Sequence, residues 1–143
     1  MKLYFDSAYV GKCYLHEPDG VEVRKVAGRA SGLYSSALAV VELASLLLRH
    51  RREKRMTGEQ GAIVRELFQQ DVRDGSWILL PVSSRILYRA ESVAIGLPAT
   101  VFLRAGDAIH LASAAEAKFD EIWTSDRHML AAAPHFGLIG RSV

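Results

Sequence analysis

The chain has 143 residues, half of them hydrophobic and 24% charged, with a formal net charge of +2. This is the size and composition of one globular domain over residues 1–143, and it excludes a disordered chain. No apolar run approaches the roughly 20 residues of a membrane span, and an acidic residue near the N-terminus argues against a signal peptide. A single cysteine excludes a disulfide framework or a multi-thiolate metal site. We therefore expect a cytoplasmic protein.

The sequence predicts short strands that alternate with longer helices. Strands are expected over residues 2–5, 32–35, 77–80, 121–124 and 137–139. Helices are expected over residues 8–16, 21–30, 37–55, 57–74, 85–95 and 103–118, with a further short helix through residue 133. Strands that alternate with helices of about ten or more residues favour an α/β fold with a mainly parallel central sheet.

Apolar residues at helical spacing predict which face of three of these helices is buried. In the helix over 37–55, the predicted face comprises Leu38, Val41, Ala44, Ser45 and Leu48, with Glu42 beside it. In the helix over 57–74, the residues predicted to point inward are Ile63, Leu67 and Phe68. The alanine-rich helix over 103–118 has Asp107 at the head of a stripe of Ala108, Leu111, Ala112 and Ala115.

Two acidic residues follow predicted strands, and two others adjoin predicted apolar faces. Asp6 comes directly after the first strand, and Asp126 lies just after the fourth. Because parallel strands place their carboxyl ends at one edge of the sheet, both acids are expected at that edge, where ligands bind in such folds. Glu42 and Asp107 are placed to reach the same edge from flanking helices.

Each of these acids also has a simpler interpretation. Asp6, Asp107 and Asp126 stand near helix starts, where an aspartate side chain often caps free backbone N–H groups. Glu42 would face solvent if the phase of its helix differed by one residue. The case for a functional site therefore rests on all four acids meeting.

Four carboxylates at one place would repel one another, and some would stay protonated unless a cation neutralised them. Hard oxygen ligands, without a set of cysteines or histidines, suit Mg²⁺ or Mn²⁺ better than structural zinc. A bound ion of this kind lowers the pKa of a water molecule and stabilises charge that develops on a phosphodiester. The pattern thus favours metal-dependent hydrolysis.

The segments that carry these acids resemble the PIN-domain family, in particular the VapC-type toxins of bacterial and archaeal toxin–antitoxin pairs. The resemblance is carried by Lys-Leu-Tyr-Phe-Asp6-Ser7, Glu42 in the long helix, Arg104-Ala-Gly-Asp107-Ala-Ile-His-Leu-Ala112 and Trp-Thr124-Ser-Asp126. It spans essentially the whole chain, and its middle segment is the most specific. It implies a three-layer α/β/α fold with a mainly parallel sheet, and a Mg²⁺- or Mn²⁺-dependent endoribonuclease.

The resemblance also implies roles for individual residues. Asp6 and Asp107 would be the main metal ligands, while Glu42 and Asp126 would bind the metal directly or through water. Ser7 and Thr124 match positions at which the family often has a small residue with a hydroxyl group. These hydroxyls would orient the acids or a bound water. His110 falls in a common family segment but is given no catalytic role here, and is interpreted as a satisfied helix histidine.

Partners follow from the same resemblance. It implies an RNA substrate and a small cognate antitoxin that lies across the acidic groove, with the surface beside Leu46 and Leu47 as its docking place. It also implies a homodimer and no contact with a membrane. The alternative is that leucines on these helices are ordinary protein surface.

Basic residues gather in the segment 49–55, which contains Arg49, Arg51, Arg52, Lys54 and Arg55. Together with Arg104, they are candidates for contact with RNA phosphates, and the segment can equally serve partner binding. The simpler interpretation is a solvated helix end, where cations complement the helix dipole.

Two other classes of protein remain as alternatives. A non-catalytic α/β interaction module would use the acids only as helix caps, and its stability would not respond to divalent metal. A receiver-like Mg²⁺-binding signalling domain, or a haloacid-dehalogenase phosphatase, is less favoured. Asp6 has no acidic partner beside it, and the strand over 77–80 is not followed by an aspartate.

Overall fold

The computed structural model describes residues 1–143 and contains five strands, seven α-helices and one short 3₁₀ helix. In chain order these are β1 (Lys2–Tyr4), α1 (Ser7–Lys12), α2 (Gly20–Gly28), β2 (Gly32–Ser36), α3 (Ala39–Arg52), α4 (Gly58–Arg73), β3 (Trp77–Leu80), α5 (Ser84–Ile95), α6 (Ala105–Glu116), β4 (Glu121–Trp123), α7 (Arg127–Ala132), η1 (Ala133–Phe136) and β5 (Ile139–Arg141). None of the helices has the length and apolar character needed to cross a membrane.

The strands are all parallel. β1 pairs with β2 and β2 with β3, while β4 pairs with β5. A single parallel bridge between Phe5 and Trp123 joins the two groups, so that the order across the molecule is β3-β2-β1-β4-β5. The expected mainly parallel sheet is confirmed.

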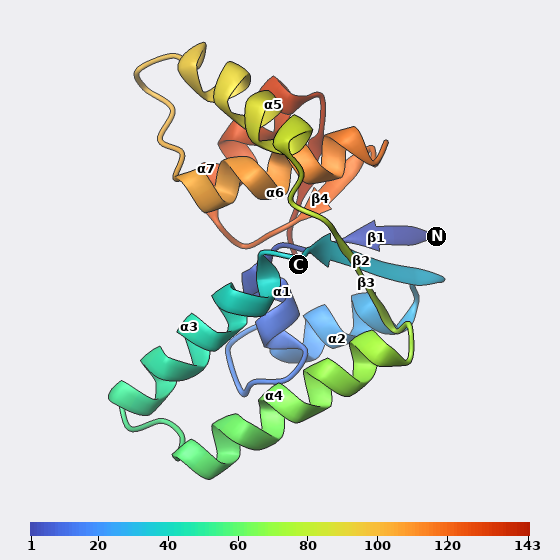
Figure 1. The fold of residues 1–143 in the computed structure, drawn as a ribbon, viewed down its shortest axis with the longest axis vertical. Coiled ribbons are helices and arrows are strands. Elements are labelled where there is room, and N and C mark those ends of the chain that lie inside the picture. Colours follow the sequence, from blue (N-terminus) through green and yellow to red (C-terminus); the bar gives the residue numbers. More distant parts are fainter.

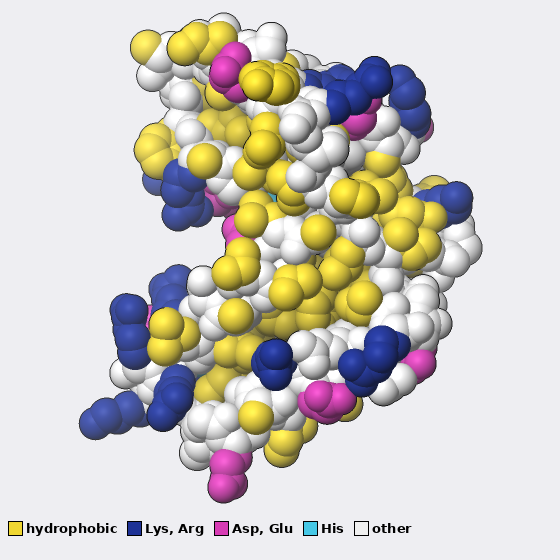
Figure 2. All heavy atoms as spheres, viewed as in Figure 1, with side chains coloured by type: hydrophobic (Ala, Val, Ile, Leu, Met, Phe, Trp, Pro, Cys, Tyr) yellow, Lys and Arg dark blue, Asp and Glu magenta, His cyan; other side chains and the backbone are white.

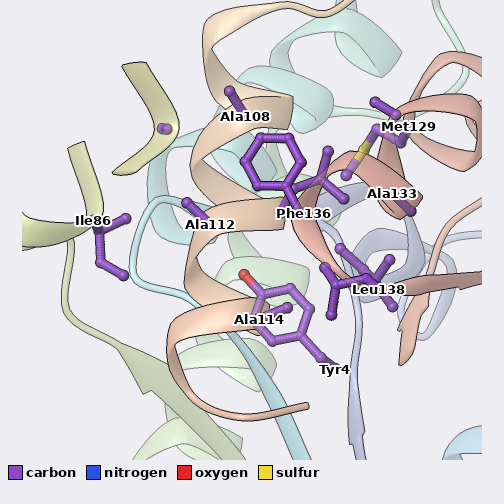
Figure 3. Close-up of a cluster of buried hydrophobic side chains, with 13 residues drawn as sticks. Tyr4, Ile86, Ala108, Ala112, Ala114, Met129, Ala133, Phe136 and Leu138 are labelled. Carbon is purple, nitrogen blue, oxygen red and sulfur yellow. The ribbon is translucent and has the colours of Figure 1, made fainter. Parts of the chain in front are cut away.

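Helices cover the sheet on both sides, as Figure 1 shows: α1 to α4 lie on one side, and α5 to α7 lie on the other. The hydrophobic core is correspondingly split in two. Alternate residues of β1 enter different halves, because successive strand side chains point to opposite faces. Leu3 and Phe5 pack with α1 to α4, whereas Tyr4 packs with α6 and the C-terminal elements, as Figure 3 shows. The fold is thus the expected three-layer α/β/α arrangement.

The chain reverses its direction of winding between β1 and β4. From β1 it proceeds to β2 and β3 over one face, and from β3 it returns over the other face to β4 and β5. Right-handed crossovers require helices on opposite faces for the two directions, which the structure has. The carboxyl ends of β1 and β4 therefore flank the point where the strand order reverses, the usual ligand position in such sheets.

Most predicted elements are present, but α1 is shorter than the predicted helix over 8–16. It ends at Lys12, with Cys13 as its C-cap. The residues after it turn back over the helix and bury Leu15, which is only 4% exposed. Burial of this leucine in the tertiary structure outweighs the helical tendency of the segment.

The predicted inward face of α3 is wrong. Val41 and Leu48 are more than half exposed, whereas the buried residues are Ala39, Leu43 and His50. The first half of this helix is apolar around most of its circumference, so periodicity alone does not decide its phase. Packing against α1 decides it: a Cβ on Gly11 would lie 2.5 Å from Cδ2 of Leu46, so α3 approaches α1 closely at this glycine, and a larger residue would require the leucine side chain to shift.

The predicted inward face of α4 is correct for Phe68 and wrong for Ile63 and Leu67. Phe68 is buried together with Val64, while Ile63 and Leu67 are 60% and 53% exposed. In α6, by contrast, the predicted stripe is buried as expected at Ala108, Leu111 and Ala112, with Ala115 half-buried. The middle of this alanine-rich helix is in fact buried on all sides, since residues 110–114 are buried in succession, and the predicted stripe is only part of its buried surface.

Candidate active site

The carboxylate of Asp6 is held at the carboxyl end of β1 by two donors. Its Oδ1 accepts a hydrogen bond from the backbone N–H of Tyr9 at 2.9 Å, which makes Asp6 the N-cap of α1. Its Oδ2 accepts from the hydroxyl of Thr124 at 2.5 Å. The cap interpretation of Asp6 is therefore correct, but it describes only one of the two oxygens. The side chain is almost wholly buried, at 4% exposure of the residue.

Thr124 connects the ends of β1 and β4. While its hydroxyl donates to Asp6, the same oxygen accepts from the backbone N–H of Asp126 at 3.0 Å. Asp126 in turn caps α7, because its Oδ1 accepts from the N–H groups of His128 and Met129 at 2.7 and 3.4 Å. The second oxygen of Asp126 does not take part in capping the helix and can interact with the other site residues.

Asp107 lies in the first turn of α6, where Arg104 holds the N-cap position. The interpretation of Asp107 as the N-cap is therefore wrong. Its side chain is 14% exposed and contacts Arg104, whose Nε lies 3.4 Å from Asp107 Oδ2. The Nη2 of the same arginine lies 3.4 Å from Asp126 Oδ2. One guanidinium thus bridges two acids that come from different elements.

Three of the acids share one region, because Arg104 lies 3.4 Å from both Asp107 and Asp126, and Thr124 bonds to Asp6 and to the N–H of Asp126. Burial raises the pKa of Asp6, and the negative charge of Asp107 raises it further, although the Thr124 hydrogen bond lowers it. Burial also raises the pKa of Asp107; Arg104 opposes this shift, and Asp126 reinforces it. Carboxylates that raise one another's pKa in a buried place are stabilised by a cation. In the chain as folded, Arg104 supplies that positive charge.

Glu42 approaches from α3, on the other side of the sheet from α6. Its Oε1 accepts a hydrogen bond from the Ser7 hydroxyl at 2.6 Å and lies 2.7 Å from Nε2 of His110. Burial alone would raise the pKa of Glu42, but the hydrogen bonds of His110 and Ser7 and the charge of Arg104 outweigh it, so the pKa is lowered. Glu42 is thus held at the sheet edge by His110 and Ser7, with 33% of its side chain still exposed.

Sequence reasoning gave His110 no role beyond that of a satisfied helix residue, and it overlooked the Tyr4 hydroxyl. His110 is satisfied, but its partner is Glu42, one of the four acids. Tyr4 bonds to the other ring nitrogen at 2.9 Å. Two signals were available: His110 lies one turn beyond Asp107 on a helix, and Tyr4 lies two residues before Asp6 on a strand, so each shares a face with an acid.

Lys12 is a second feature that the sequence did not suggest. Its ammonium group is largely buried and donates to Ser125 Oγ at 3.1 Å and to the carbonyl of Pro18 at 3.3 Å. Ser125 lies between Thr124 and Asp126, in the loop that follows β4. Lys12 therefore attaches α1 to the loop that presents two of the site residues.

The basic residues of the segment 49–55 do not join the acids. Arg49, Arg51 and Arg52 lie about 10–15 Å along α3 from Glu42 at 1.5 Å per residue, Lys54 and Arg55 follow the end of the helix, and all five are exposed. Arg49 and Arg55 both pair with Glu53, at 3.1 and 2.5 Å. Figure 2 shows a hollow between α3 and the layer of α5 to α7, with Lys and Arg side chains on both of its sides and an acidic side chain at its base.

The donor set at the strand ends suits a hard divalent cation. It consists of carboxylate and hydroxyl oxygens from Asp6, Asp107, Asp126 and Thr124. Burial is the main cause of the raised pKa values of Asp6 and Asp107, and a bound cation would favour their charged forms. With Arg104 between two of the acids, no three acidic, histidine or cysteine side chains are arranged as a complete metal-binding group. Ion binding would need Arg104, which is 67% exposed, to move aside.

Comparisons with known proteins identify one matching family and several solved structures with a similar fold. The family model of the PIN domain matches residues 4–134. The chain is 29% identical over 146 residues to Ribonuclease VapC47 of Mycobacterium tuberculosis, an alignment that covers 98% of this chain and 96% of that protein.

Among solved structures, the fold is similar to VapBC2 from Rickettsia felis bound to a DNA fragment from its promoter, with a TM-score of 0.70, 12% identity and coverage of 100% and 99% of the two chains. It is also similar to FitAcB from Neisseria gonorrhoeae, with a TM-score of 0.69, 15% identity and coverage of 98% and 96%. A toxin–antitoxin complex from Klebsiella pneumoniae matches with a TM-score of 0.65 at 13% identity, over 99% and 95% of the chains.

Proposed function

The chain belongs to the PIN-domain family, and from this premise we propose that it is a Mg²⁺- or Mn²⁺-dependent endoribonuclease, the toxin of a type II toxin–antitoxin pair. The observation that carries the proposal is the meeting of Asp6, Asp107 and Asp126 at the point where the strand order reverses. The similarity to a protein named as a ribonuclease supports the same activity. The proposed enzyme acts in the cytoplasm as a single nuclease domain.

The metal would be held chiefly by Asp6 and Asp107, with Asp126 and Glu42 binding it directly or through water. When bound, it would supply positive charge that activates a water molecule and stabilises the phosphodiester during hydrolysis. Ser7 and Thr124 orient two of the acids through the hydrogen bonds described above. Because Thr124 and Tyr9 occupy both oxygens of Asp6 from the protein side, that carboxylate presents a fixed orientation.

RNA would lie in the hollow beside α3 in Figure 2, where basic side chains flank the acids. Arg104 is the candidate nearest the acids, and its release from Asp107 and Asp126 would free it for a phosphate oxygen. The exposed cluster of Arg49, Arg51, Arg52, Lys54 and Arg55 would extend phosphate contact to the far end of α3. Such contacts supply affinity without base specificity.

The antitoxin would occupy the apolar groove between α3 and α4. This groove has a volume of about 390 Å³ and is lined mainly by hydrophobic side chains, among them Val40, Val41, Leu47, Phe68 and Val72. Figure 2 shows hydrophobic surface over this part of the molecule. Support comes from the similarity to solved toxin–antitoxin complexes. We also propose that the chain forms a homodimer.

A non-catalytic interaction module is the second candidate, and one observation favours it. Asp6 and Asp126 do serve as helix caps, as such a module would require. It does not explain why Asp107, which is not an N-cap, is buried beside them with a raised pKa. Divalent ions would stabilise the nuclease by mass action and leave the module unchanged.

The decisive experiment is cleavage of total RNA by the purified chain without antitoxin. It is run with Mg²⁺, with Mn²⁺ and with chelator, beside the variant Asp107→Asn and beside a melting curve in each condition. Discrete metal-dependent fragments that the variant does not produce would establish the nuclease and locate its cleavage sites. Absence of cleavage, together with a melting temperature that neither ion changes, would favour the interaction module.

A further inference from the structure

Four side chains from four elements form one series of hydrogen bonds that ends at Glu42. Tyr4 on β1 bonds to Nδ1 of His110 on α6 at 2.9 Å. Nε2 of His110 lies 2.7 Å from Oε1 of Glu42 on α3 and 2.9 Å from the Ser7 hydroxyl at the start of α1. The Ser7 hydroxyl donates to the same Glu42 oxygen at 2.6 Å. The series therefore links the sheet with both helical layers.

One tautomer of His110 gives every bond of the series a donor and an acceptor. An ionised carboxylate only accepts, so the hydrogen of the imidazole lies on Nε2, toward Glu42. In the neutral ring, Nδ1 then carries a lone pair, and the Tyr4 hydroxyl donates to it. Ser7 accepts from the shared Nε2–H and donates its own hydrogen to Glu42. Two donors thus converge on Oε1 of Glu42, and the Tyr4 hydroxyl supports one of them from the other side of the imidazole ring.

The series is shielded from water over most of its length. Tyr4 is fully buried, and His110 is 2% exposed. Their rings also meet edge to face, with centroids 5.9 Å apart, and Figure 3 shows the Tyr4 hydroxyl directed toward α6. Burial raises the pKa of Tyr4, so its hydroxyl keeps its hydrogen. Without competing water, these bonds determine the orientation of the imidazole.

The second oxygen of Glu42 is positioned by the backbone of α6. A Cβ built on Gly106 would lie 3.2 Å from Glu42 Oε2, so the glycine lets the carboxylate approach the first turn of the helix closely. Asp107 follows Gly106 directly in that turn. With Oε1 held by Ser7 and His110, the carboxylate of Glu42 is left with one oxygen beside the segment that carries Asp107.

We propose that Tyr4 and His110 are positioning residues of the nuclease: they hold Oε1 of Glu42 so that its Oε2 is presented to Asp107 at the start of α6. The role rests on the proposed function, since it assigns these residues to the same site. Neither residue needs to contact RNA or metal. Outer-shell partners of this kind typically change metal affinity or activity by about 10- to 100-fold when they are replaced.

The test compares variants of the full chain in two assays: steady-state RNA cleavage with Mg²⁺, and the Mn²⁺ concentration at the midpoint of metal-induced thermal stabilisation. Tyr4→Phe removes only the hydroxyl and keeps the buried ring. Tyr34→Phe is the matched control, because Tyr34 packs on the same face of the sheet and its hydroxyl makes no hydrogen bond to another side chain. His110→Gln retains an amide donor toward Glu42, whereas His110→Leu removes it.

We expect Tyr4→Phe to lower kcat about tenfold with little change in KM, and to shift the Mn²⁺ midpoint upward, while Tyr34→Phe does neither. His110→Gln should retain more activity than His110→Leu. If Tyr4 acts through Glu42, adding Tyr4→Phe to Glu42→Gln should shift the Mn²⁺ midpoint no further.

The positioning role would be overturned if Tyr4→Phe lowered the melting temperature but matched Tyr34→Phe in kcat and in the Mn²⁺ midpoint. An equal further shift in the Glu42→Gln background would overturn it too, because the hydroxyl would then act independently of Glu42. A wild-type chain without metal-dependent cleavage and without Mn²⁺ stabilisation is a different result: it would reject the proposed function itself, and this role with it.

Discussion

The hydroxyl of Thr124 donates to Oδ2 of Asp6 at 2.5 Å and so joins the ends of β1 and β4, which are 118 residues apart in the chain. Only one isolated bridge connects the backbones of these strands, at Phe5 and Trp123. The Thr124 hydroxyl therefore adds a side-chain link at the place where the strand order reverses. It also sets the distance between two of the acids, because it accepts from the N–H of Asp126.

Thr124→Val should destabilise the protein although the two side chains have nearly the same shape. It leaves one oxygen of buried Asp6 and the N–H of Asp126 without their partner, which costs about 1–3 kcal/mol. Urea unfolding in chelator measures the loss, and Thr124→Ser, which keeps the hydroxyl, should recover most of it. Equal stability of the valine variant and the wild type would show that water replaces the hydroxyl.

Asp107→Asn should stabilise the metal-free protein at neutral pH while it abolishes cleavage. The folded-state pKa of Asp107 is raised, so its contribution to stability is present below its unfolded pKa and is lost as pH rises through the folded pKa. At neutral pH the charged side chain is a cost, and its removal should raise the melting temperature by a few degrees.

Melting curves in chelator between pH 3 and 8 test this expectation, with Asp120→Asn as control because Asp120 is an exposed acid outside the site. The advantage of Asp107→Asn should shrink toward acid pH, and Mg²⁺ should stabilise only the wild type. A variant that is less stable than the wild type at neutral pH would contradict the electrostatic account of the site.

Glu42→Gln should have the opposite effect on stability. The folded-state pKa of Glu42 is lowered, so its contribution is present above its unfolded pKa and is lost as pH falls through the folded pKa. Replacement weakens charge-assisted hydrogen bonds from Ser7 and His110, and should cost about 1 kcal/mol at neutral pH. The same pH series measures it, with the exposed Glu91→Gln as control. A loss that persists unchanged at pH 3 would point to packing instead of charge.

Arg104→Met should weaken RNA binding with little effect on folding. The side chain is 67% exposed, so its ion pairs with Asp107 and Asp126 contribute little stability. If it contacts one phosphate, KM should rise and the slope of log affinity against log salt should fall in magnitude by about 0.7. Arg29→Met, an exposed residue without an ion pair, is the control. An unchanged salt slope would remove Arg104 from the RNA surface.

Local sequence signals were sufficient for most of the secondary structure, although not for the end of α1 or the bounds of β5, and for two of the acids. Trp77–Leu80 is a short apolar run closed by proline, and it forms β3 with the predicted bounds. Ser83 is the N-cap of α5, because its hydroxyl accepts a hydrogen bond from the backbone N–H of Ile86. Asp6 and Asp126 meet because parallel strands that alternate with helices have their carboxyl ends on one edge, a consequence of topology that needs no side-chain detail.

The phase of α3 and the partners of each acid could not be derived in this way. Val41 and Leu43 are equally apolar in the sequence, and only contact with α1 makes Leu43 the buried one. Whether Asp107 is a helix cap or a site residue depends on where α6 begins. Arg104 occupies the N-cap position, so Asp107 lies inside the first turn.

The sequence by itself determined the α/β class, the order of the elements and the edge at which the acids gather, because periodicity and chain direction are local properties. The tertiary structure alone decided that His110 bonds to Glu42, across 68 positions of the chain. Hydrogen bonds of that kind depend on the distance and angle between atoms of separate helices. These are set by the close packing of whole side chains, such as the approach of α6 to Glu42 at Gly106.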